Sequence, residues 1–354
     1  MILMENKALA PLTTFGIGGA ARWFVEAHSE EDVVEAVAWA EEQGARLLVL
    51  GGGSNLLISD AGFDGLVMRV CLRGITASSA PGESGQIVYE AAAGEDWDGF
   101  VERTVRDNCA GVECLAGIPG TVGGTPVQNV GAYGQEVASV IERVRAYDLE
   151  DRAFVEFAAA ECGFTYRRSR FNSICRGRYV VTRVDYRLHA GGAPMLRYAD
   201  LQRAFAASGS ENGKLALAEV AAVVRSLRKS KGMLLVDGEP DCRSAGSFFK
   251  NPVIGAGELR QIAERCGKKL PSYPAGEETP DHFKVPAAWL IEQAGFTKGY
   301  QWGAAGVSSR HTLALINRGG ATAAEILALA DRICAAVEDQ FGIRLEMEPV
   351  MAGF

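Results

Sequence analysis

The chain has 354 residues, of which 48% are hydrophobic and 23% are charged, a composition typical of globular domains. Its length is sufficient for two or three domains with cores of their own. The formal net charge of −8 argues against nucleic acid or an anionic membrane as a general partner, although a local cluster of cations could still bind a small anion.

The cysteines and the N-terminus indicate the environment in which the chain works. The eight cysteines are scattered without a C-x-x-C pair, and the four histidines form no zinc-like cluster with them. We therefore expect free thiols in a reducing cytoplasm and no metal site. Residues 1–10 lack the apolar run of a signal peptide, and no stretch approaches the roughly 18 apolar residues of a membrane span.

The first 75 residues predict a small α/β unit. Ser29 with Asp32 is typical of a helix N-terminus, and Gly44 of the end of that helix. The neutral segment Gly51–Asn55 (GGGSN) directly follows a buried strand. The strands expected in this unit are 22–27, 46–50 and 66–70.

A second unit is expected over residues 76–236. A Ser/Gly-rich loop at 78–86 is interpreted as lying near the boundary between the two units. Strands are expected at 87–92, 140–149 and 179–188, helices from Trp97 to Gly111 and over 217–228, and a polar connection at 206–214.

Residues 237–341 predict a third domain, of α/β type. Loop-rich stretches that contain proline alternate with helical patterns at 256–266, 286–294 and 322–341. Thr322 and Glu325 form a capping box at the start of the last helix. A short final strand at 343–350, within residues 342–354, is expected to complete the second unit.

The segment Gly117–Gly134 (GIPGTVGGTPVQNVGAYG) contains six glycines in eighteen residues and no charge. Glycine permits positive φ angles and close approach of main-chain N–H groups to a ligand, and successive inward-facing amides form a nest for anions such as phosphate. The alternative is a long solvated linker, but Ile118, Val122 and Val127 are too apolar for one. We interpret the segment as an ordered ligand-binding loop.

Widespread nucleotide-binding motifs do not account for the glycine-rich loops. Gly16–Ala21 fits G-x-G-x-x-A, but it precedes a strand instead of following one, which excludes a Rossmann fingerprint. Gly51–Asn55 follows a strand but lacks the Gly-Lys-Ser/Thr of a P-loop, and Ser247 does not lie in the G-x-S-x-G of hydrolases. The three neutral loops together predict a long, diphosphate-bearing cofactor that is held by backbone groups.

Six motifs in a fixed order provide a more specific indication. They are TTFGIGGAA (13–21), GGGSNLL (51–57), GIPGTVGG with QNVGAYGQE (117–136), YRRSRF (166–171), AGSFFKNP (245–252) and LEMEP (345–349). Taken together, they make the chain resemble the UDP-N-acetylenolpyruvoylglucosamine reductase family, also called UDP-N-acetylmuramate dehydrogenase. The resemblance extends from Thr13 to Pro349.

This resemblance implies an α+β fold. Two subdomains of the vanillyl-alcohol-oxidase (PCMH) type would bind FAD non-covalently, and a C-terminal α/β domain would bind the substrate. The implied reaction reduces UDP-N-acetylglucosamine enolpyruvate to UDP-N-acetylmuramate with NADPH, a cytoplasmic step of peptidoglycan precursor synthesis, performed by a monomer. The positions that match the family's FAD-binding motifs are Gly51, Gly52, Gly53, Ser54, Asn55, Gly117, Ile118, Pro119, Gly120, Thr121, Gly123, Gly124, Gln128, Asn129 and Gly131.

Three positions match the family's catalytic residues. Arg167 resembles the arginine that polarises the substrate carboxylate, a task that suits its planar guanidinium. Glu348 resembles the acidic partner, and Ser247 resembles the donor of a proton to C2 of the enolpyruvyl group. Because a serine hydroxyl is a weak acid, we expect assistance from a polar network that includes Lys250 or water.

Five further positions match substrate contacts, namely Tyr133, Tyr198, Lys231, Asn251 and Gln293. Lys231 resembles the lysine that binds the diphosphate, and Arg228 and Lys229 in the same basic run compete for that role. Tyr198 resembles the tyrosine that closes over the nucleotide in one subtype of the family; the alternative is an aromatic residue at a strand edge.

Two other functions are compatible with the motifs. One is an FAD oxidase of the same fold that acts on a sugar or an alcohol. Such oxidases often tether the flavin through histidine or cysteine, and the glycine loops contain no histidine. The other is a UDP-sugar binding module without a cofactor.

Overall fold

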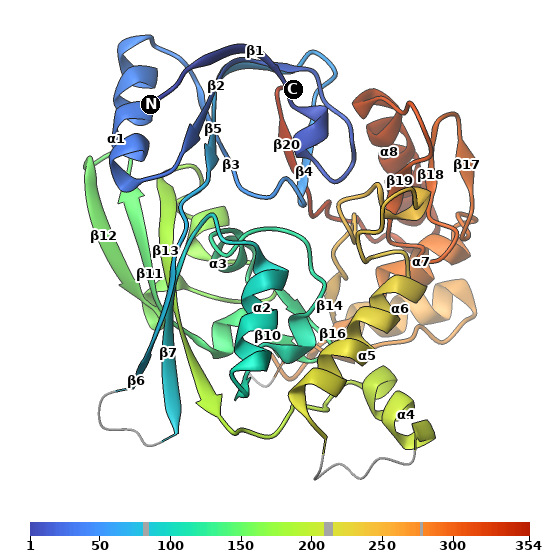
Figure 1. The fold of residues 1–354 in the computed structure, drawn as a ribbon. Helices are drawn as coiled ribbons and strands as arrows, with labels where there is room; N and C mark the ends of the chain where they lie inside the picture. Colours follow the sequence, from blue (N-terminus) through green and yellow to red (C-terminus); the bar gives the residue numbers. More distant parts are fainter. Residues whose placement is uncertain (81–84, 209–214, 277–278) are drawn as a thin grey trace. The chain divides into compact units, whose positions relative to one another are not determined.

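The computed structural model describes residues 1–80, 85–208, 215–276 and 279–354. These residues form two compact units, each drawn from three separate segments of the chain (Figure 1). Unit 1 comprises Met1–Lys7, Ala21–Gly53 and Phe63–Ser230, and unit 2 comprises Ala8–Ala20, Ser54–Gly62 and Lys231–Phe354. Most of the two subdomains expected at 1–75 and 76–236 therefore belongs to a single unit.

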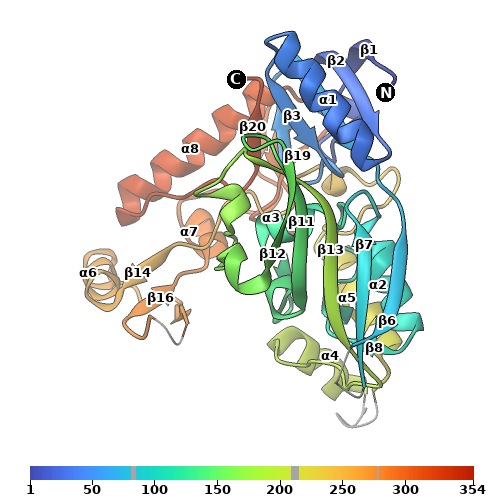
Figure 2. The same ribbon diagram turned by 90° about the vertical axis from the view of Figure 1, so that its left-hand side faces the viewer.

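The first sheet of unit 1 has the strand order β1-β2-β5-β3, and helix α1 packs beside it (Figure 2). These elements are β1 (Met4–Ala8), β2 (Ala20–Ala27), α1 (Glu30–Glu42), β3 (Leu47–Leu50) and β5 (Phe63–Val70). The Ser29 hydroxyl accepts a hydrogen bond from the Asp32 N–H at 3.1 Å, so the expected helix N-terminus is confirmed. Val33, Ala36 and Ala40 form its buried stripe.

The second sheet of unit 1 is antiparallel, with the order β12-β11-β13-β7-β6 and β8 beside β13. Its strands are β6 (Ile75–Ser79), β7 (Gln86–Ala92), β8 (Cys109–Ala110), β11 (Ile141–Asp148), β12 (Ala153–Ala158) and β13 (Tyr179–Ala190). Helices α2 (Trp97–Arg106) and α5 (Leu217–Ser230) cover one face of this sheet (Figure 2). Phe100 of α2 packs against Tyr186 of β13, with ring centroids 4.8 Å apart.

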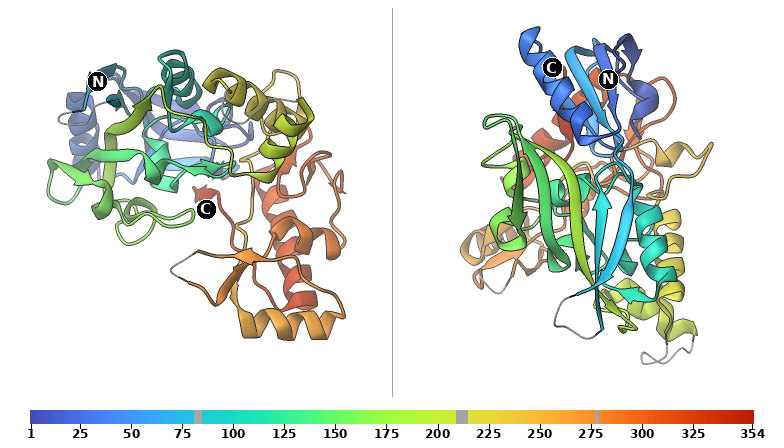
Figure 3. Two further views of the ribbon diagram at one scale, coloured as in Figure 1. Left: turned by 90° about the horizontal axis from the view of Figure 1, so that it is seen from below. Right: turned by 60° about the vertical axis from the view of Figure 1, so that its left-hand side comes forward.

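Figure 3 shows the other face of this twisted sheet. Charged side chains of β11, β12 and β13 form ion pairs on it. Arg143 pairs with Glu156 at 2.7 Å, and Arg183 pairs with Asp185 at 2.8 Å. Strand alternation places these residues opposite the buried positions that face α2 and α5. The pair of Arg143 with Glu156 is partly exposed and therefore contributes about 0–1 kcal/mol, as surface pairs do, whereas Asp185 is buried.

The described part of unit 2 contains short strands and three α-helices. Its strands are β4 (Leu56–Ile58), β14 (Val253–Gly255), β15 (Tyr273–Pro274), β16 (His282–Lys284), β17 (Gln301–Trp302), β18 (Ala305–Val307), β19 (Leu315–Asn317) and β20 (Val350–Ala352). They pair in the sheets β14-β16-β15, β17-β18-β19 and β20-β4. The helices are α6 (Ala256–Cys266), α7 (Ala287–Gln293) and α8 (Ala323–Phe341). The capping box between Thr322 and Glu325 is present as expected, and the apolar stripe of α8 is buried.

Several short elements were not predicted, and they lie in or near the glycine loop. They are α3 (Gly124–Gln128), β9 (Gly131–Ala132), β10 (Gln135–Glu136) and α4 (Ala199–Ser208). Within the part of the chain that the structure describes, no helix is long and apolar enough to cross a membrane.

Three further expectations differ from the structure. The helix expected to run to Gly111 ends at Arg106, since Asn108 adopts a left-handed φ of 54° and β8 begins at Cys109. Ser78 and Ser79 belong to β6 and Gln86 belongs to β7, and these strands pair in one sheet, so the segment 78–86 does not separate domains. Its residues 81–84, and residues 209–214 of the second polar connection, lie outside the described residues.

The third difference concerns the C-terminal strand. β20 pairs in parallel with β4 of unit 2, with Val350 opposite Leu56, and therefore does not complete the sheet of residues 76–236. The backbone N–H of Val350 also donates to the Asn55 carbonyl at 3.0 Å. The C-terminus of the chain is thus attached to the segment that follows the GGGSN motif.

Candidate active site

The two glycine loops of unit 1 lie directly against each other. A Cβ atom placed on Gly52 would lie 2.6 Å from the Gly120 Cα, and one on Gly51 would lie 2.8 Å from the Thr121 hydroxyl oxygen. Only glycine permits such close approach of two backbones. The two loops are thus in contact within one unit, although they lie some 65 residues apart in the sequence. Each of them was predicted to bind a cofactor.

Backbone hydrogen bonds fix the conformation of the Gly117–Gly134 loop. The Trp97 N–H donates to the Gly120 carbonyl at 3.1 Å, and the Val122 N–H donates to the Glu95 carbonyl at 2.9 Å. The Gly123 N–H donates to the Ala93 carbonyl at 2.8 Å. The loop is therefore docked on the start of α2 and is ordered, as the sequence predicted, instead of being a solvated linker.

Asn129 ends helix α3 in the left-handed region, with φ of 42°. Its side-chain amide donates to the Thr165 carbonyl at 2.9 Å, and its side-chain oxygen accepts from the Ala138 N–H at 3.2 Å. The side chain is 1% exposed. These contacts give Asn129 an internal role, because it joins the glycine loop to the segment that carries Arg167.

Arg167 lies at the far end of the same loop. Its Nη2 donates to the Gly131 carbonyl at 2.7 Å, and its Nη1 donates to the Asn129 carbonyl at 3.4 Å. The guanidinium also lies 5.5 Å from the Tyr166 ring centroid. The structure thus brings the predicted carboxylate-binding arginine to the predicted cofactor loop.

Tyr133 and Tyr198, both predicted to contact substrate, are in edge-to-face contact with ring centroids 5.4 Å apart. Tyr133 is 8% exposed and Tyr198 is 42% exposed. Tyr198 immediately precedes α4, and Gly134 packs against Arg197. One of the two rings is therefore held in the interior, while the other covers it from the surface.

Two residues with an unusual backbone conformation lie in this loop or bind to it, namely Tyr133 and Arg167. The described residues other than glycine with positive φ are Asn6, Asn108, Asn129, Tyr133, Arg152 and Arg167. Asparagine tolerates this conformation, but tyrosine and arginine rarely adopt it. Two of the three remaining residues, Tyr133 and Arg167, are predicted site residues, as is typical of functional sites.

Ser247 and Glu348 belong to two segments of unit 2 that lie side by side. The Glu348 N–H donates to the Phe248 carbonyl, and the Lys250 N–H donates to the Glu346 carbonyl, both at 2.9 Å. The Asn55 side chain also donates to the Glu348 carbonyl at 3.3 Å. The structure therefore places Glu348 next to the residue that follows Ser247.

The other predicted residues of unit 2 have identifiable protein partners. The Lys250 ammonium pairs with Glu346 at 2.5 Å, and the Asn251 side-chain oxygen accepts from the Ala287 N–H at 2.9 Å. The Gln293 side-chain oxygen accepts from Lys268 at 2.6 Å. Asn251 and Gln293 bind at opposite ends of α7, so the structure does not bring their side chains together.

Gly16–Ala21, the third glycine-rich loop, has a packing function in unit 2. A Cβ on Gly18 would lie 2.8 Å from the Ile58 Cβ, and one on Gly19 would lie 2.4 Å from the Asp60 carbonyl oxygen. Close contact with residues 58–62 thus explains these two glycines without a ligand.

Comparison with known proteins identifies the family. The model of the UDP-N-acetylenolpyruvoylglucosamine reductase C-terminal domain matches residues 239–352, and that of an FAD binding domain matches residues 21–153. The reductase of Thermobifida fusca is 45% identical over 99% of this chain and 98% of its own length. The chain belongs to the UDP-N-acetylenolpyruvoylglucosamine reductase family.

Other relatives agree with this assignment. The reductase of Streptomyces coelicolor is 44% identical over 99% of this chain and 90% of its own. The crystal structure of the reductase from Thermus caldophilus superposes with a TM-score of 0.65 at 25% identity, covering 99% of this chain and all of that one. The predicted fold, an FAD-binding part followed by a reductase-specific C-terminal domain, is confirmed.

The residues present fit FAD as cofactor of this family. Gly52 packs so closely against Gly120 that no side chain fits where the two loops meet, and the main-chain N–H groups of such glycine loops suit the binding of a diphosphate. Within the described ranges, no group of three or more His, Cys, Asp or Glu side chains could hold a metal ion.

Some residues at the loop were not predicted. The Glu113 carboxylate is 1% exposed and accepts from the Gln135 amide at 2.8 Å and from the Met195 N–H at 3.0 Å. It therefore joins the segment after Tyr133 to the segment before Tyr198. The carboxylate also accepts from the nearby Gly111 N–H at 2.8 Å. Its link to Gln135 and Met195 could not be predicted locally, because these two partners are 22 and 82 residues away.

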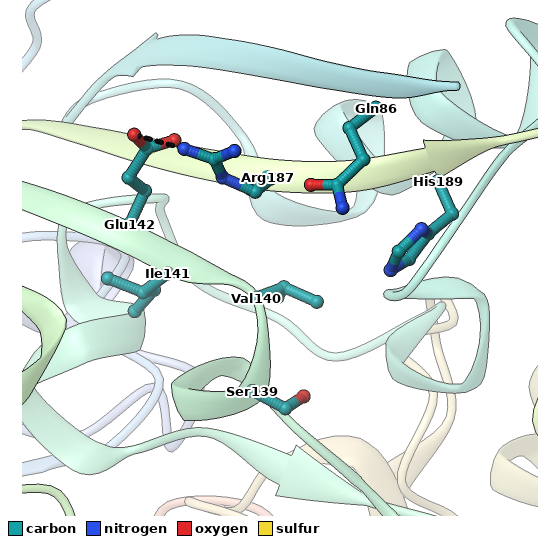
Figure 4. A pocket seen from close by; sticks show the side chains of 7 residues that line it. All are labelled: Gln86, Ser139, Val140, Ile141, Glu142, Arg187 and His189. Atoms are coloured by element: carbon teal, nitrogen blue, oxygen red, sulfur yellow. Dashed lines mark hydrogen bonds and ion pairs between the residues drawn. The ribbon is translucent and has the colours of Figure 1, made fainter. Parts of the chain in front are cut away.

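A separate pocket of unit 1, with a volume of about 240 Å³, lies beside β7, β11 and β13 (Figure 4). Arg187 and Glu142 in its wall form an ion pair at 2.7 Å. It is lined by Gln86, Ser139, Val140, Ile141, Glu142, Arg187 and His189. None of the predicted site residues lines this pocket, so it is distinct from the glycine loops.

The contact between Gly52 and Gly120 makes a testable prediction. Gly52→Ala is expected to raise the Kd for FAD about 10- to 100-fold, because a methyl group cannot fit against the Gly120 backbone without separating the loops. Fluorescence titration of the flavin-free protein measures this. Gly257→Ala, at a helical glycine with nothing within 4 Å, is the matched control. Equal FAD affinity in both variants would contradict the prediction.

Proposed function

We propose that the chain reduces UDP-N-acetylglucosamine enolpyruvate to UDP-N-acetylmuramate, with FAD as cofactor and NADPH as hydride donor. We further propose that it does so in the cytoplasm and as a monomer. One observation carries the proposal: two glycine loops pack backbone to backbone, and Arg167 is bound at the end of one of them. The relatives at 44–45% identity are named for this reductase activity.

The chemistry assigns separate tasks to cofactor and protein. Bound FAD would supply the hydride that adds to the enolpyruvyl double bond. The protein has to stabilise negative charge on the substrate carboxylate and deliver a proton to C2. A cation and an acid that are positioned in advance perform both tasks at low energetic cost, since they need not reorganise during the reaction.

Arg167 is the proposed partner of the substrate carboxylate. A planar guanidinium can bind a carboxylate through two parallel hydrogen bonds. Its bonds to the Gly131 and Asn129 carbonyls fix the orientation of the group, and the left-handed φ of 54° fixes the backbone from which it projects. These features support a role that depends on orientation as well as on charge.

Ser247 is the proposed proton donor, with Glu348 as the acidic group that assists it. A polar network that includes Lys250 or water was expected to assist, but the Lys250 ammonium is paired with Glu346. Glu348 is hydrogen-bonded through its backbone to Phe248, next to Ser247. We therefore favour Glu348 over Lys250 as the ionisable neighbour in the proton transfer.

The substrate nucleotide is proposed to meet Tyr133, Tyr198 and Lys231, together with Asn251 and Gln293. The contact between the two tyrosine rings supports a joint role for them. The side chains of Asn251 and Gln293 already accept hydrogen bonds within unit 2, from the Ala287 N–H and from Lys268.

An anaerobic spectroscopic experiment tests the proposed function. The purified protein should show flavin absorption, NADPH should bleach it, and UDP-N-acetylglucosamine enolpyruvate should restore it. Absence of flavin absorption even after FAD is added would indicate a UDP-sugar binding module without cofactor. Colour that remains on the denatured, filtered protein, with no response to the enolpyruvyl substrate, would indicate an oxidase with covalently attached flavin.

A further inference from the structure

The first residue of the glycine loop is hydrogen-bonded on both sides by charged side chains. The Gly117 N–H donates to the Asp98 Oδ1 at 2.6 Å, and the Gly117 carbonyl accepts from the Arg228 Nε at 2.9 Å. Gly117 is buried and has a φ of 72°. Hydrogen bonds to ionised groups are about twice as strong as those between neutral groups. The two peptide groups that flank Gly117 are therefore each fixed by a strong hydrogen bond to a charged side chain.

Asp98 and Arg228 come from neighbouring helices, and a third side chain, that of Arg225, binds Asp98. Asp98 lies in the first turn of α2, and Arg228 lies in the last turn of α5 (Figure 1). Arg225 of α5 donates to both Asp98 oxygens, at 2.7 and 3.3 Å, and to Glu102 at 3.0 Å. Because Arg225 and Arg228 are three residues apart, they project from the same face of α5. The set Asp98, Arg225 and Arg228, here called the Gly117 clamp, thus connects both helices to the loop.

Burial of Arg228 is the unusual feature of this arrangement. The residue is 8% exposed. Burial lowers the pKa of its guanidinium, and the nearby Tyr133 and Asp98 oppose that shift. A buried charge is costly, and apolar residues of similar volume often stabilise a fold equally well. Such a residue is better explained by a task at the loop than by packing alone.

We propose that the Gly117 clamp positions the glycine loop for FAD, and that Arg228 serves this purpose and is not the cation for the substrate diphosphate. The proposal rests on the proposed function, because it takes FAD as the ligand of the loop. A loop that is held in its bound conformation loses less entropy when the ligand binds, so its affinity is higher. Of the three candidate cations, this leaves Lys229 and Lys231 for the diphosphate.

Titration of the flavin-free, full-length protein with FAD tests the clamp. Arg228→Met keeps most of the side-chain volume but removes the donor to the Gly117 carbonyl, and should raise the Kd for FAD about 10- to 100-fold. Arg228→Lys should recover part of the affinity, since an ammonium can donate to the same carbonyl. Asp98→Asn should have an intermediate effect, because its amide oxygen can still accept from the Gly117 N–H while the ion pair with Arg225 is lost.

Arg103→Met is the matched control. Arg103 lies on α2, as Asp98 does, and its exposed side chain pairs with Asp107 at 2.7 Å at the other end of the helix, so we expect the Kd for FAD to stay within about twofold. The thermal midpoint of each flavin-free variant separates loop positioning from loss of global stability. If Arg228→Met does not fold, Asp98→Asn provides the decisive comparison.

Three outcomes would overturn the proposal. An unchanged Kd for FAD with a raised KM for the UDP substrate would make Arg228 a ligand of the diphosphate. A lower thermal midpoint without any change in FAD affinity would make the clamp a feature of folding only. If the unsubstituted protein itself bound no FAD, the proposed function would fail together with the clamp, whereas normal FAD binding by every variant would refute the clamp alone.

Discussion

Ser247→Ala is expected to lower the rate at which substrate restores the bleached flavin absorption by about 10²- to 10⁴-fold, the usual contribution of a positioned acid. Bleaching by NADPH should continue at the normal rate, because Ser247 is proposed to act only on the proton for C2. Anaerobic stopped-flow absorbance, with each reactant mixed separately, measures the two steps. The selective loss of one step is what identifies a proton donor.

Two variants make this result specific. Ser247→Thr retains a hydroxyl and should keep part of the second step, although the added methyl group is not neutral at a half-buried position. Ser78→Ala removes an exposed hydroxyl in β6 and should change neither step. If Ser247→Ala restored the absorption as fast as the unsubstituted protein, the proton would have to come from another group.

The secondary structure could be predicted where local chemistry determines it. The helix expected at 256–266 has the same bounds in the structure, and Thr322 with Glu325 starts α8 where the capping box indicated. Such signals need only residues within one or two turns. The strands β14 to β19 contain two or three residues each, too few for an alternating pattern to be recognised.

Pairing between segments that are far apart in the chain could not be predicted from the sequence. The final strand was assigned to the wrong part of the chain, because its partner β4 is almost 300 residues earlier and shares no local pattern with it. For the same reason the sequence predicted two subdomains where most of residues 1–236 form a single unit. The ion pair of Glu30 with Arg145, at 2.8 Å, joins two segments that composition alone suggested were separate.

For the site, the sequence predicted the loops better than their supports. Glycine content and lack of charge indicated three loops. Gly51–Asn55 and Gly117–Gly134 do meet, whereas Gly16–Ala21 packs against residues 58–62 instead. Asp98 and Arg225, by contrast, cannot be distinguished in the sequence from other charged residues on the exposed faces of amphipathic helices. Their connection to Gly117 depends on how α2 packs against α5, which no local pattern contains.

Arg167→Met is expected to lower kcat by about 10²- to 10³-fold, the typical loss when one group that stabilises developing charge is removed. Arg167→Lys should recover only part of this, because an ammonium keeps the charge but not the planar fork that binds a carboxylate through two hydrogen bonds. Both variants should still bind FAD and be bleached by NADPH. Steady-state rates and the KM for the enolpyruvyl substrate measure the effect.

Arg168→Met is the control, since Arg168 is an exposed neighbour in the same YRRSRF motif. The FAD affinity of Arg167→Met decides between two roles for the residue. Arg167 binds the Gly131 carbonyl at one end of the loop, as Arg228 binds the Gly117 carbonyl at the other. A loss of FAD affinity as large as the loss of kcat would therefore mean that both arginines hold the loop. A loss of kcat at unchanged affinity would separate them: Arg228 would then position the cofactor, and Arg167 would act on the substrate carboxylate.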